Sequence, residues 1–193
     1  MRTFRHRATR MVVGANLKVM FTFLTRHPAF TAEQVGWCDV LLWRDPLDRI
    51  VSMFFDKCRA NLDPGNVQGV QKLIMDRLGV DDVRRLADVE FSELVPCLEA
   101  IMMRDWHLTP QVSGVRLKDI GRVVDIATGL PGLGKELGVD FSSRENAGSH
   151  RPALEYYTPA TRETIERLYA MDFAARGHRS LELRLKRLAG WFR

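Results

Sequence analysis

The sequence predicts an α/β fold in which a central, mostly parallel sheet is flanked by helices. Two short apolar runs, residues 11–13 and 40–43, each lead directly into a helical pattern, and residues 120–126 form a third strand pattern. Few strands separated by helical stretches favour crossover connections over an all-helical bundle. The chain has 193 residues, 46% hydrophobic and 27% charged, which suits one folded domain over residues 1–193 without a repeat or a linker.

The first strand-to-helix unit contains a turn of small residues. Residues 11–13 are expected to form a short strand, Gly14, Ala15 and Asn16 a turn, and a helix follows. Unpaired backbone N–H groups at such a turn can bind phosphate or sulfate, and Lys18 would add a full positive charge. On this pattern alone, an ordinary strand-turn-helix without a ligand remains the alternative.

The second unit begins with the apolar run that ends before Arg44. Asp45 and Pro46 then predict a helix start, with the aspartate as N-cap and the proline as first helical residue. Apolar residues recur at helical spacing from residue 47 to residue 58, and the turn cluster at residues 63–66 ends the helix.

Arg44 and Ser52 are the candidate ligand-binding residues of this second unit. In a parallel sheet both strand-to-helix junctions lie at the carboxyl edge, where ligands bind. A guanidinium and a hydroxyl there suit a second phosphate-like group. The alternative for Arg44 is a surface ion pair with Asp45 or Asp48.

The remaining periodic segments complete the α/β order. Helices are expected at residues 70–78 and 91–102, a helix follows the strand at 120–126 and ends near Gly138, and Thr158 and Pro159 open a last one.

The charge distribution argues against a nucleic-acid-binding face. The net charge is +5, but residues 1–10 hold +4 and residues 176–193 hold +5, so the interior is acidic overall. Residues 176–193 are expected to form a basic amphipathic helix that either docks on the domain or lies on an anionic surface such as a membrane. No apolar run is long enough to span a membrane and no secretory signal is expected, so we predict a cytoplasmic protein with three unpaired cysteines.

Five segments resemble a known family. Residues 44–57 are similar to the R-x-P-x-x-R-x-x-S-x-x-x-x-K signature of carbohydrate-type, family 2-like sulfotransferases, which use 3′-phosphoadenosine 5′-phosphosulfate (PAPS). Residues 16–21 resemble N-W-K-R-V-L, and residues 105–111 resemble D-x-H-W-x-P-Q. Residues 146–149 and 169–178 resemble N-x-S and Y-x-x-D-F-x-x-F-G-Y. The resemblance implies a sulfotransferase fold related to the P-loop NTPases, in which Arg44 and Ser52 hold the 3′-phosphate.

The implied activity is transfer of the sulfuryl group of PAPS to a hydroxyl, most plausibly of a carbohydrate, without a metal. The family's phosphosulfate loop reads P-K-x-x-x-[ST]; aligned through Asn16 and Lys18, its lysine and hydroxyl positions fall on Met11 and Ala15. Arg10 is then the nearest cation that could replace the lysine. His107 matches the motif histidine and is the candidate base, because imidazole can accept a proton at neutral pH, and Asp105 could orient its ring. A histidine that only bonds a backbone group is the alternative.

Two other functions remain open. The replaced loop residues suggest a relative that binds PAPS or its product without turnover and acts through a partner. Residues 129–135 also fit the G-x-x-x-x-G-K pattern of a nucleoside-triphosphate loop, although Glu136 stands where that loop needs Ser or Thr. The histidines do not have metal-ligand spacing.

Overall fold

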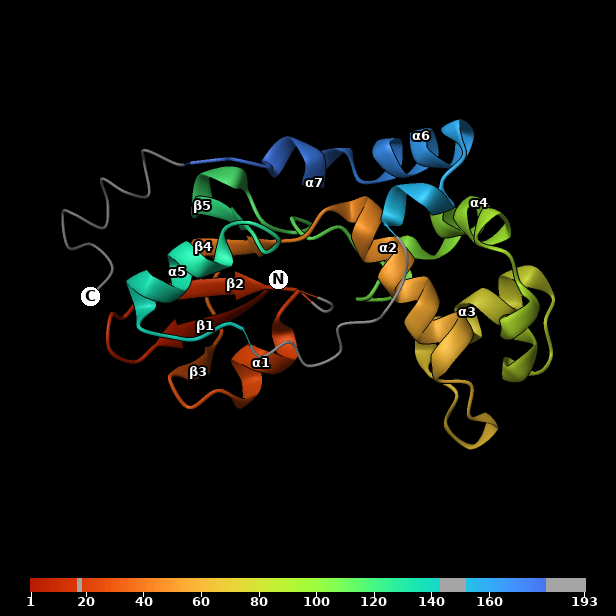
Figure 1. Ribbon diagram of the computed structural model, residues 1–193, viewed down its shortest axis with the longest axis horizontal. Helices are drawn as coiled ribbons and strands as arrows, with labels where there is room; N and C mark the ends of the chain where they lie inside the picture. Colours follow the sequence, from red (N-terminus) through yellow and green to blue (C-terminus); the bar gives the residue numbers. More distant parts are fainter. Residues whose placement is uncertain (17–18, 143–151, 180–193) are drawn as a thin grey trace. The chain divides into compact units, whose positions relative to one another are not determined.

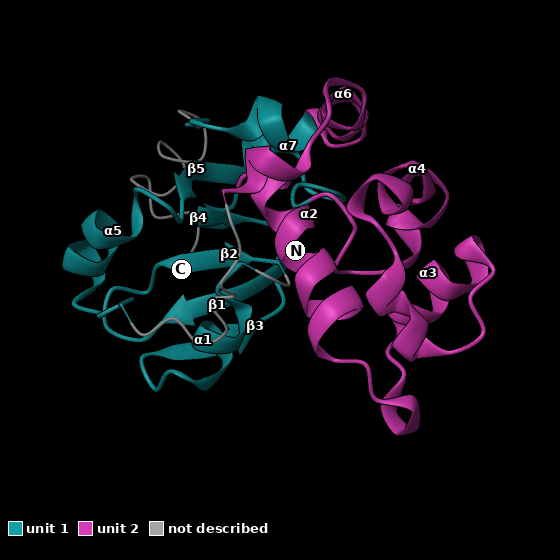
Figure 2. Ribbon diagram, turned by 45° about the vertical axis from the view of Figure 1, so that its right-hand side comes forward, with its two compact units in different colours: residues 1–44, 111–146, 171–193 teal, residues 45–110, 147–170 magenta. Residues whose placement is uncertain are grey.

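The computed structural model describes residues 1–16, 19–142 and 152–179. The chain divides into two compact units (Figure 2). The first comprises residues 1–44, 111–146 and 171–193, and the second comprises residues 45–110 and 147–170. One domain over residues 1–193 stays a prediction.

Within the described residues, the first unit contains a five-stranded mixed sheet (Figure 1). Its order is β3-β1-β2-β4-β5, formed by β1 (Arg2–His6), β2 (Val12–Ala15), β3 (Phe30–Glu33), β4 (Cys38–Trp43) and β5 (Ile120–Asp125). β4 pairs in parallel with β2 and β5, whereas β1 is antiparallel to β2 and β3. Four strands therefore run in one direction and β1 opposes them, which confirms the predicted α/β class with a mostly parallel sheet.

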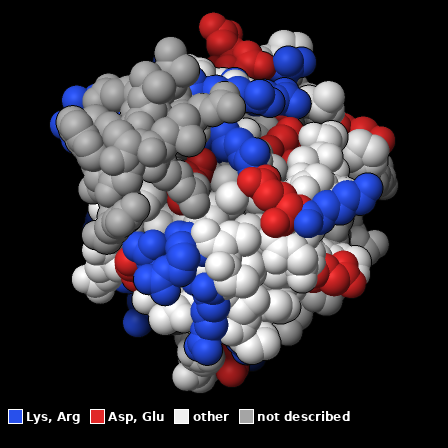
Figure 3. Space-filling model, turned by 90° about the vertical axis from the view of Figure 1, so that its left-hand side faces the viewer, with Lys and Arg blue, Asp and Glu red and all other residues white. Residues whose placement is uncertain are grey.

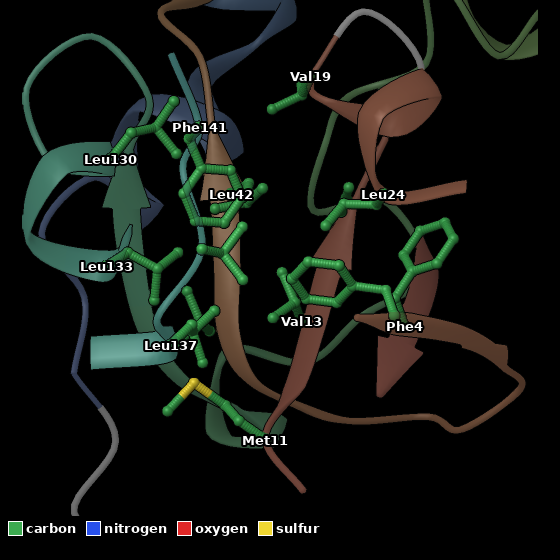
Figure 4. Close-up of a cluster of buried hydrophobic side chains, with 14 residues drawn as sticks. Phe4, Met11, Val13, Val19, Leu24, Leu42, Leu130, Leu133, Leu137 and Phe141 are labelled. Carbon is green, nitrogen blue, oxygen red and sulfur yellow. The ribbon is translucent and has the colours of Figure 1, made fainter. Parts of the chain in front are cut away.

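Both faces of this sheet are covered. β4 is buried along its whole length, as a strand covered on both sides requires. Figure 4 shows one face, where strand side chains pack with those of α1 (Phe21–Arg26) and α5 (Leu130–Leu137). The buried residues of this cluster include Phe4, Val13, Leu24, Leu42, Leu130, Leu133 and Leu137. On the other face, Val12 and Leu41 pack with Val112, Ile120 and Ala175 of α7 (Ala170–Ala175).

The sequence does not predict β1 and β3. β1 is joined to β2 by a hairpin at residues 7–10, closed by hydrogen bonds from His6 N to Met11 O (2.8 Å) and from Arg10 N to His6 O (2.9 Å). Across the β1–β3 pair, Arg5 Nε donates to Glu33 Oε1 at 3.1 Å. Charged side chains on β1 and on the edge strand β3 conceal the apolar alternation that would otherwise indicate strands.

The second unit is helical within the described residues. α2 (Pro46–Phe55) begins where predicted, with Asp45 as N-cap accepting from Leu47 N at 2.8 Å, and it continues into a π-helical turn, Asp56–Ala60. α3 (Gly69–Leu78), α4 (Phe91–Ile101) and α6 (Pro159–Leu168) also confirm the predicted helices. Tyr157 ties the segment before α6 to α2, because its hydroxyl donates to Leu47 O at 3.0 Å.

The predicted C-terminal helix, residues 176–193, lies mostly outside the described residues. Its first four residues form a turn and an edge contact of the sheet instead: Val123 N donates to His178 O at 2.9 Å, and Arg179 forms an antiparallel bridge with Arg122. None of the helices in the described ranges is long and apolar enough to cross a membrane.

Candidate functional site

The loop after β2 and the residue after β4 start from the same edge of the sheet. The parallel register pairs Val13 with Val40 and Gly14 with Leu41, and its continuation places Asn16 beside Trp43. Neighbouring strands lie about 5 Å apart, so Asn16 is one strand spacing from the residue that precedes Arg44. This confirms the prediction that both strand-to-helix junctions lie at the carboxyl edge.

The predicted turn of small residues is displaced by two positions. Gly14 and Ala15 are buried inside β2, and only Asn16 follows the strand. A Cβ atom at position 14 would lie 2.6 Å from Met1 Sδ and 3.0 Å from Cys38 Sγ. Close packing against neighbouring residues therefore explains Gly14, and the small side chains do not mark a loop.

The loop itself runs from Asn16 to Met20, since β2 ends at Ala15 and α1 begins at Phe21. Val19 N donates to Asn16 O at 3.0 Å, and Met20 has a left-handed backbone with φ of 55°. Few residues other than glycine adopt that conformation, and those that do are concentrated at turns and functional sites. Lys18 lies outside the described residues.

These boundaries change how the P-K-x-x-x-[ST] pattern fits the chain. Met11 directly precedes β2 and Ala15 is its last residue, so neither lies between β2 and α1. A second alignment puts Lys18 at the lysine position and Thr22 at the hydroxyl position, with Leu17 in place of the proline, and gives up the match of Lys18 to N-W-K-R-V-L. Thr22, four residues after Lys18, is then a candidate residue that the alignment through Asn16 and Lys18 does not include.

Thr22 lies at the start of helix α1. It is the second residue of α1, half-buried, and its hydroxyl makes no hydrogen bond within the described part of the chain.

The structure does not bring Arg10 to this edge. Arg10 lies in the β1–β2 hairpin, before β2 begins, with φ of 61°. A four-residue strand separates it from Asn16, which is about 13 Å of extended chain. Arg10 is therefore too far along the strand from Asn16 to take the place of the loop lysine, as we had expected it to do.

Arg44 is half-buried directly after β4, and the side-chain amide of Gln111 holds its backbone. Arg44 N donates to Gln111 Oε1 at 2.9 Å, and Gln111 Nε2 donates to Arg44 O at 2.7 Å.

Cations on the face drawn in Figure 3 lie among carboxylates and uncharged surface, not in one continuous basic area. Ion pairs of the described residues include Arg5–Glu33, Arg116–Asp119 and Arg122–Glu136.

Ser52 and Arg49 belong to the second unit. Ser52 is half-buried in α2, and its hydroxyl makes no hydrogen bond within the described ranges. Arg49 is fully buried; its Nη1 donates to Thr109 O at 2.9 Å, and its guanidinium lies 5.1 Å from the centre of the Tyr169 ring. The second arginine of the R-x-P-x-x-R-x-x-S signature therefore holds the helical unit together, and binding of a ligand by Arg44 and by Ser52 stays a prediction.

His107 and Asp105, also in the second unit, form a hydrogen-bonded pair. One Asp105 oxygen, Oδ1, lies 2.7 Å from both the backbone N and the ring Nδ1 of His107. The His107 side chain is 22% exposed and the Asp105 side chain is 14% exposed. When Nδ1 carries the proton given to this carboxylate, Nε2 is the lone-pair nitrogen, which is the arrangement that a general base needs.

Three other expectations have different outcomes. Residues 146–149 lie outside the described residues, so the N-x-S resemblance has no structural counterpart here. The nucleoside-triphosphate pattern is wrong as a phosphate loop, because Gly134 and Lys135 lie within helix α5 and not in a loop before it. Among the described side chains, no three His, Cys, Asp or Glu residues are grouped as metal ligands.

A comparison with protein families identifies the chain. The model of sulfotransferase family 2, described as the sulfotransferase family, matches residues 5–123, a segment that contains the loop at 16–20, Arg44, Ser52 and His107. No curated protein and no solved structure is significantly similar to the chain. Because the family match covers more than half of the 193 residues, the chain belongs to the sulfotransferase family.

Proposed function

We propose that the protein transfers the sulfuryl group of PAPS to a hydroxyl of a carbohydrate-like acceptor. The observation that carries this proposal is the position of the loop between β2 and α1. It shares the carboxyl edge of the sheet with Arg44, and the sequence across it supplies both a lysine and a hydroxyl at the family's spacing.

The proposal gives each residue of this edge a role. Lys18 would assist departure of the bridging oxygen, the Thr22 hydroxyl and the backbone N–H groups after Asn16 would bind the 5′-phosphate, and Arg44 would bind the 3′-phosphate. Ser52 is the second residue that the signature assigns to the 3′-phosphate. The donor set fits PAPS, since two separated anionic groups need two separated sets of N–H and O–H donors.

In the proposed reaction PAPS supplies an activated sulfuryl group. Transfer needs in-line positioning, stabilisation of charge on the leaving oxygen and removal of the acceptor proton. His107 Nε2 would take that proton, while Asp105 fixes the ring and stabilises the imidazolium.

The chain around His107 supports a saccharide acceptor. Trp106, the residue before His107, is 56% exposed, and Met103 is 65% exposed, so this segment presents large apolar side chains to solvent. An indole face next to a candidate base offers the apolar area on which a sugar ring can pack while its hydroxyls stay hydrogen-bonded.

The alternative is a relative that binds PAPS or PAP without turnover and acts through a partner. It depends on the alignment that puts Met11 and Ala15 at the lysine and hydroxyl positions of the loop, and the position of both residues before the end of β2 favours the alignment with Lys18 and Thr22.

The test combines binding with turnover. Isothermal titration with 3′-phosphoadenosine 5′-phosphate (PAP), the stable product, is followed by transfer of labelled sulfate from PAPS to a panel of saccharides. We compare Lys18→Ala with Lys135→Ala, which removes the exposed lysine of the α5 pattern and serves as the matched control. We expect wild-type binding and transfer, with transfer reduced at least about 100-fold by Lys18→Ala and unchanged by Lys135→Ala.

Absence of PAP binding by the wild-type protein contradicts the proposal. Binding with no transfer to any acceptor of the panel restores the non-catalytic alternative, and a loss confined to Lys135→Ala overturns the loop assignment.

A further inference from the structure

The Gln111 side chain forms hydrogen bonds with both the backbone N and the backbone O of Arg44, as the backbone of a neighbouring strand would. Its carboxamide accepts from Arg44 N at 2.9 Å and donates to Arg44 O at 2.7 Å, and Gln111 is fully buried. Arg44 follows the last residue of β4, where the backbone leaves the sheet. The two bonds of one planar amide fix both the position and the tilt of the Arg44 backbone at that point.

Asp172 holds the glutamine in turn. Its Oδ2 accepts from Gln111 N at 2.9 Å and lies 3.4 Å from Gln111 Nε2, while its Oδ1 accepts from Val112 N at 3.0 Å. Its backbone O accepts from Trp43 Nε1 at 2.9 Å. Asp172 and Trp43 are fully buried. The aspartate therefore joins the segment at 111–112 to the end of β4.

This network gives the arginine a rigid base. An arginine side chain has several rotatable bonds, and each loses conformational entropy when the side chain binds a phosphate. Fixing the backbone removes part of that cost before the ligand arrives, which is the meaning of preorganisation.

We infer that Gln111 and Asp172 are positioning residues that aim Arg44 at the 3′-phosphate of the nucleotide. Neither residue needs to touch the nucleotide, and both act through the Arg44 backbone. The inference rests on the proposed function, because it assumes that Arg44 binds that phosphate.

The experiment compares two buried glutamines. Gln111→Met keeps the length of the side chain and removes both bonds to Arg44. Gln71→Met is the matched control: Gln71 is also fully buried, and its Nε2 donates to Lys57 O at 3.0 Å and to Asn61 O at 2.6 Å. Both variants should melt at lower temperature, because each leaves buried backbone groups without a partner.

PAP affinity separates positioning from stability. We expect the PAP Kd to rise about tenfold in Gln111→Met and to stay within about twofold of wild type in Gln71→Met. Measured again in an Arg44→Ala background, Gln111→Met should cause no additional loss, because two residues acting through one contact are not additive. A further tenfold loss in that background, or equal losses in the two glutamine variants, overturns the inference.

The experiment distinguishes failure of the positioning inference from failure of the proposed function. If wild-type protein does not bind PAP, the proposed function fails; if it binds and the Gln111→Met loss is absent or additive, only the positioning inference fails. If Gln111→Met does not fold, Asp172→Asn replaces it, and PAP affinity is again measured in the wild-type and Arg44→Ala backgrounds. The amide NH2 of the asparagine would face one of the backbone N–H donors that Asp172 binds, so that hydrogen bond would be lost.

Discussion

Replacing Asp105 with Asn separates the charge of the Asp105–His107 pair from its shape. Asparagine has nearly the same size, and its Oδ1 can still accept from the backbone N and the Nδ1 of His107, both 2.7 Å from that oxygen in the wild-type protein. What disappears is the carboxylate charge that faces the imidazolium formed when His107 takes the acceptor proton.

The magnitude follows from Coulomb's law. Opposite charges about 4 Å apart interact by about 4 kcal/mol at an effective dielectric constant of about 20. Because the two side chains are 22% and 14% exposed, solvent screening reduces this to about 2 kcal/mol, which is about a 30-fold loss in kcat. His107→Ala removes the base altogether and should cost about 100-fold to 10,000-fold.

The assay is steady-state transfer of labelled sulfate, with PAP affinity measured in parallel. We expect kcat to fall in the order wild type, Asp105→Asn, His107→Ala, with an unchanged PAP Kd in both variants. Asp63→Asn is the control, because Asp63 also accepts from the backbone N two residues ahead, Gly65 N at 2.8 Å, without a histidine. Wild-type kcat in His107→Ala, or a loss in Asp63→Asn equal to that in Asp105→Asn, would refute the assignment of the base.

Three further predictions concern the loop, the hairpin and the cysteines. Thr22→Val should weaken PAP binding about 10-fold to 100-fold by removing a hydroxyl bond to a phosphate, whereas Thr22→Ser should bind like wild type; equal binding by both contradicts the alignment. Arg10→Gly should keep full transfer and raise the melting temperature, because glycine relieves a left-handed backbone that costs about 1–2 kcal/mol; lost transfer would restore Arg10 as the loop cation. Burial raises the pKa of the Cys38 and Cys58 thiols to about 12, so below that pH they stay protonated, and iodoacetamide at pH 9 should label them only in denaturant; rapid labelling of native protein contradicts their burial.

Elements with a local chemical signal were predictable. Asp45 and Pro46 open α2, Thr158 caps α6, and Gly138 ends α5 in a left-handed conformation with φ of 66°. Each signal depends on the few residues at a helix end, so no tertiary information was needed. The same holds for the apolar run of β4, which is buried throughout.

The loop boundary was not predictable because its signal is tertiary. Gly14 has the composition of a turn residue, yet it is a strand residue whose missing Cβ makes room for Met1 and Cys38. Nothing local distinguishes those two reasons for a glycine. The alignment with Lys18 and Thr22, seven residues further along the chain, comes into consideration only when the end of β2 at Ala15 is known.

The residues behind the family resemblance divide into those that could do chemistry and those that build the scaffold. Arg49, Tyr169, Gln111 and Asp172 are all fully buried and are bound to backbone groups or stacked on one another. These contacts are with the protein itself, so the four residues stabilise the two units, and Gln111 and Asp172 act on a ligand only through Arg44. A relative could keep these four residues and lose transfer, so matching their motifs shows the family but not the activity. In the proposed function the activity depends on a different set, Lys18, Thr22, Arg44 and His107, so variants of this set test whether the chain is an enzyme.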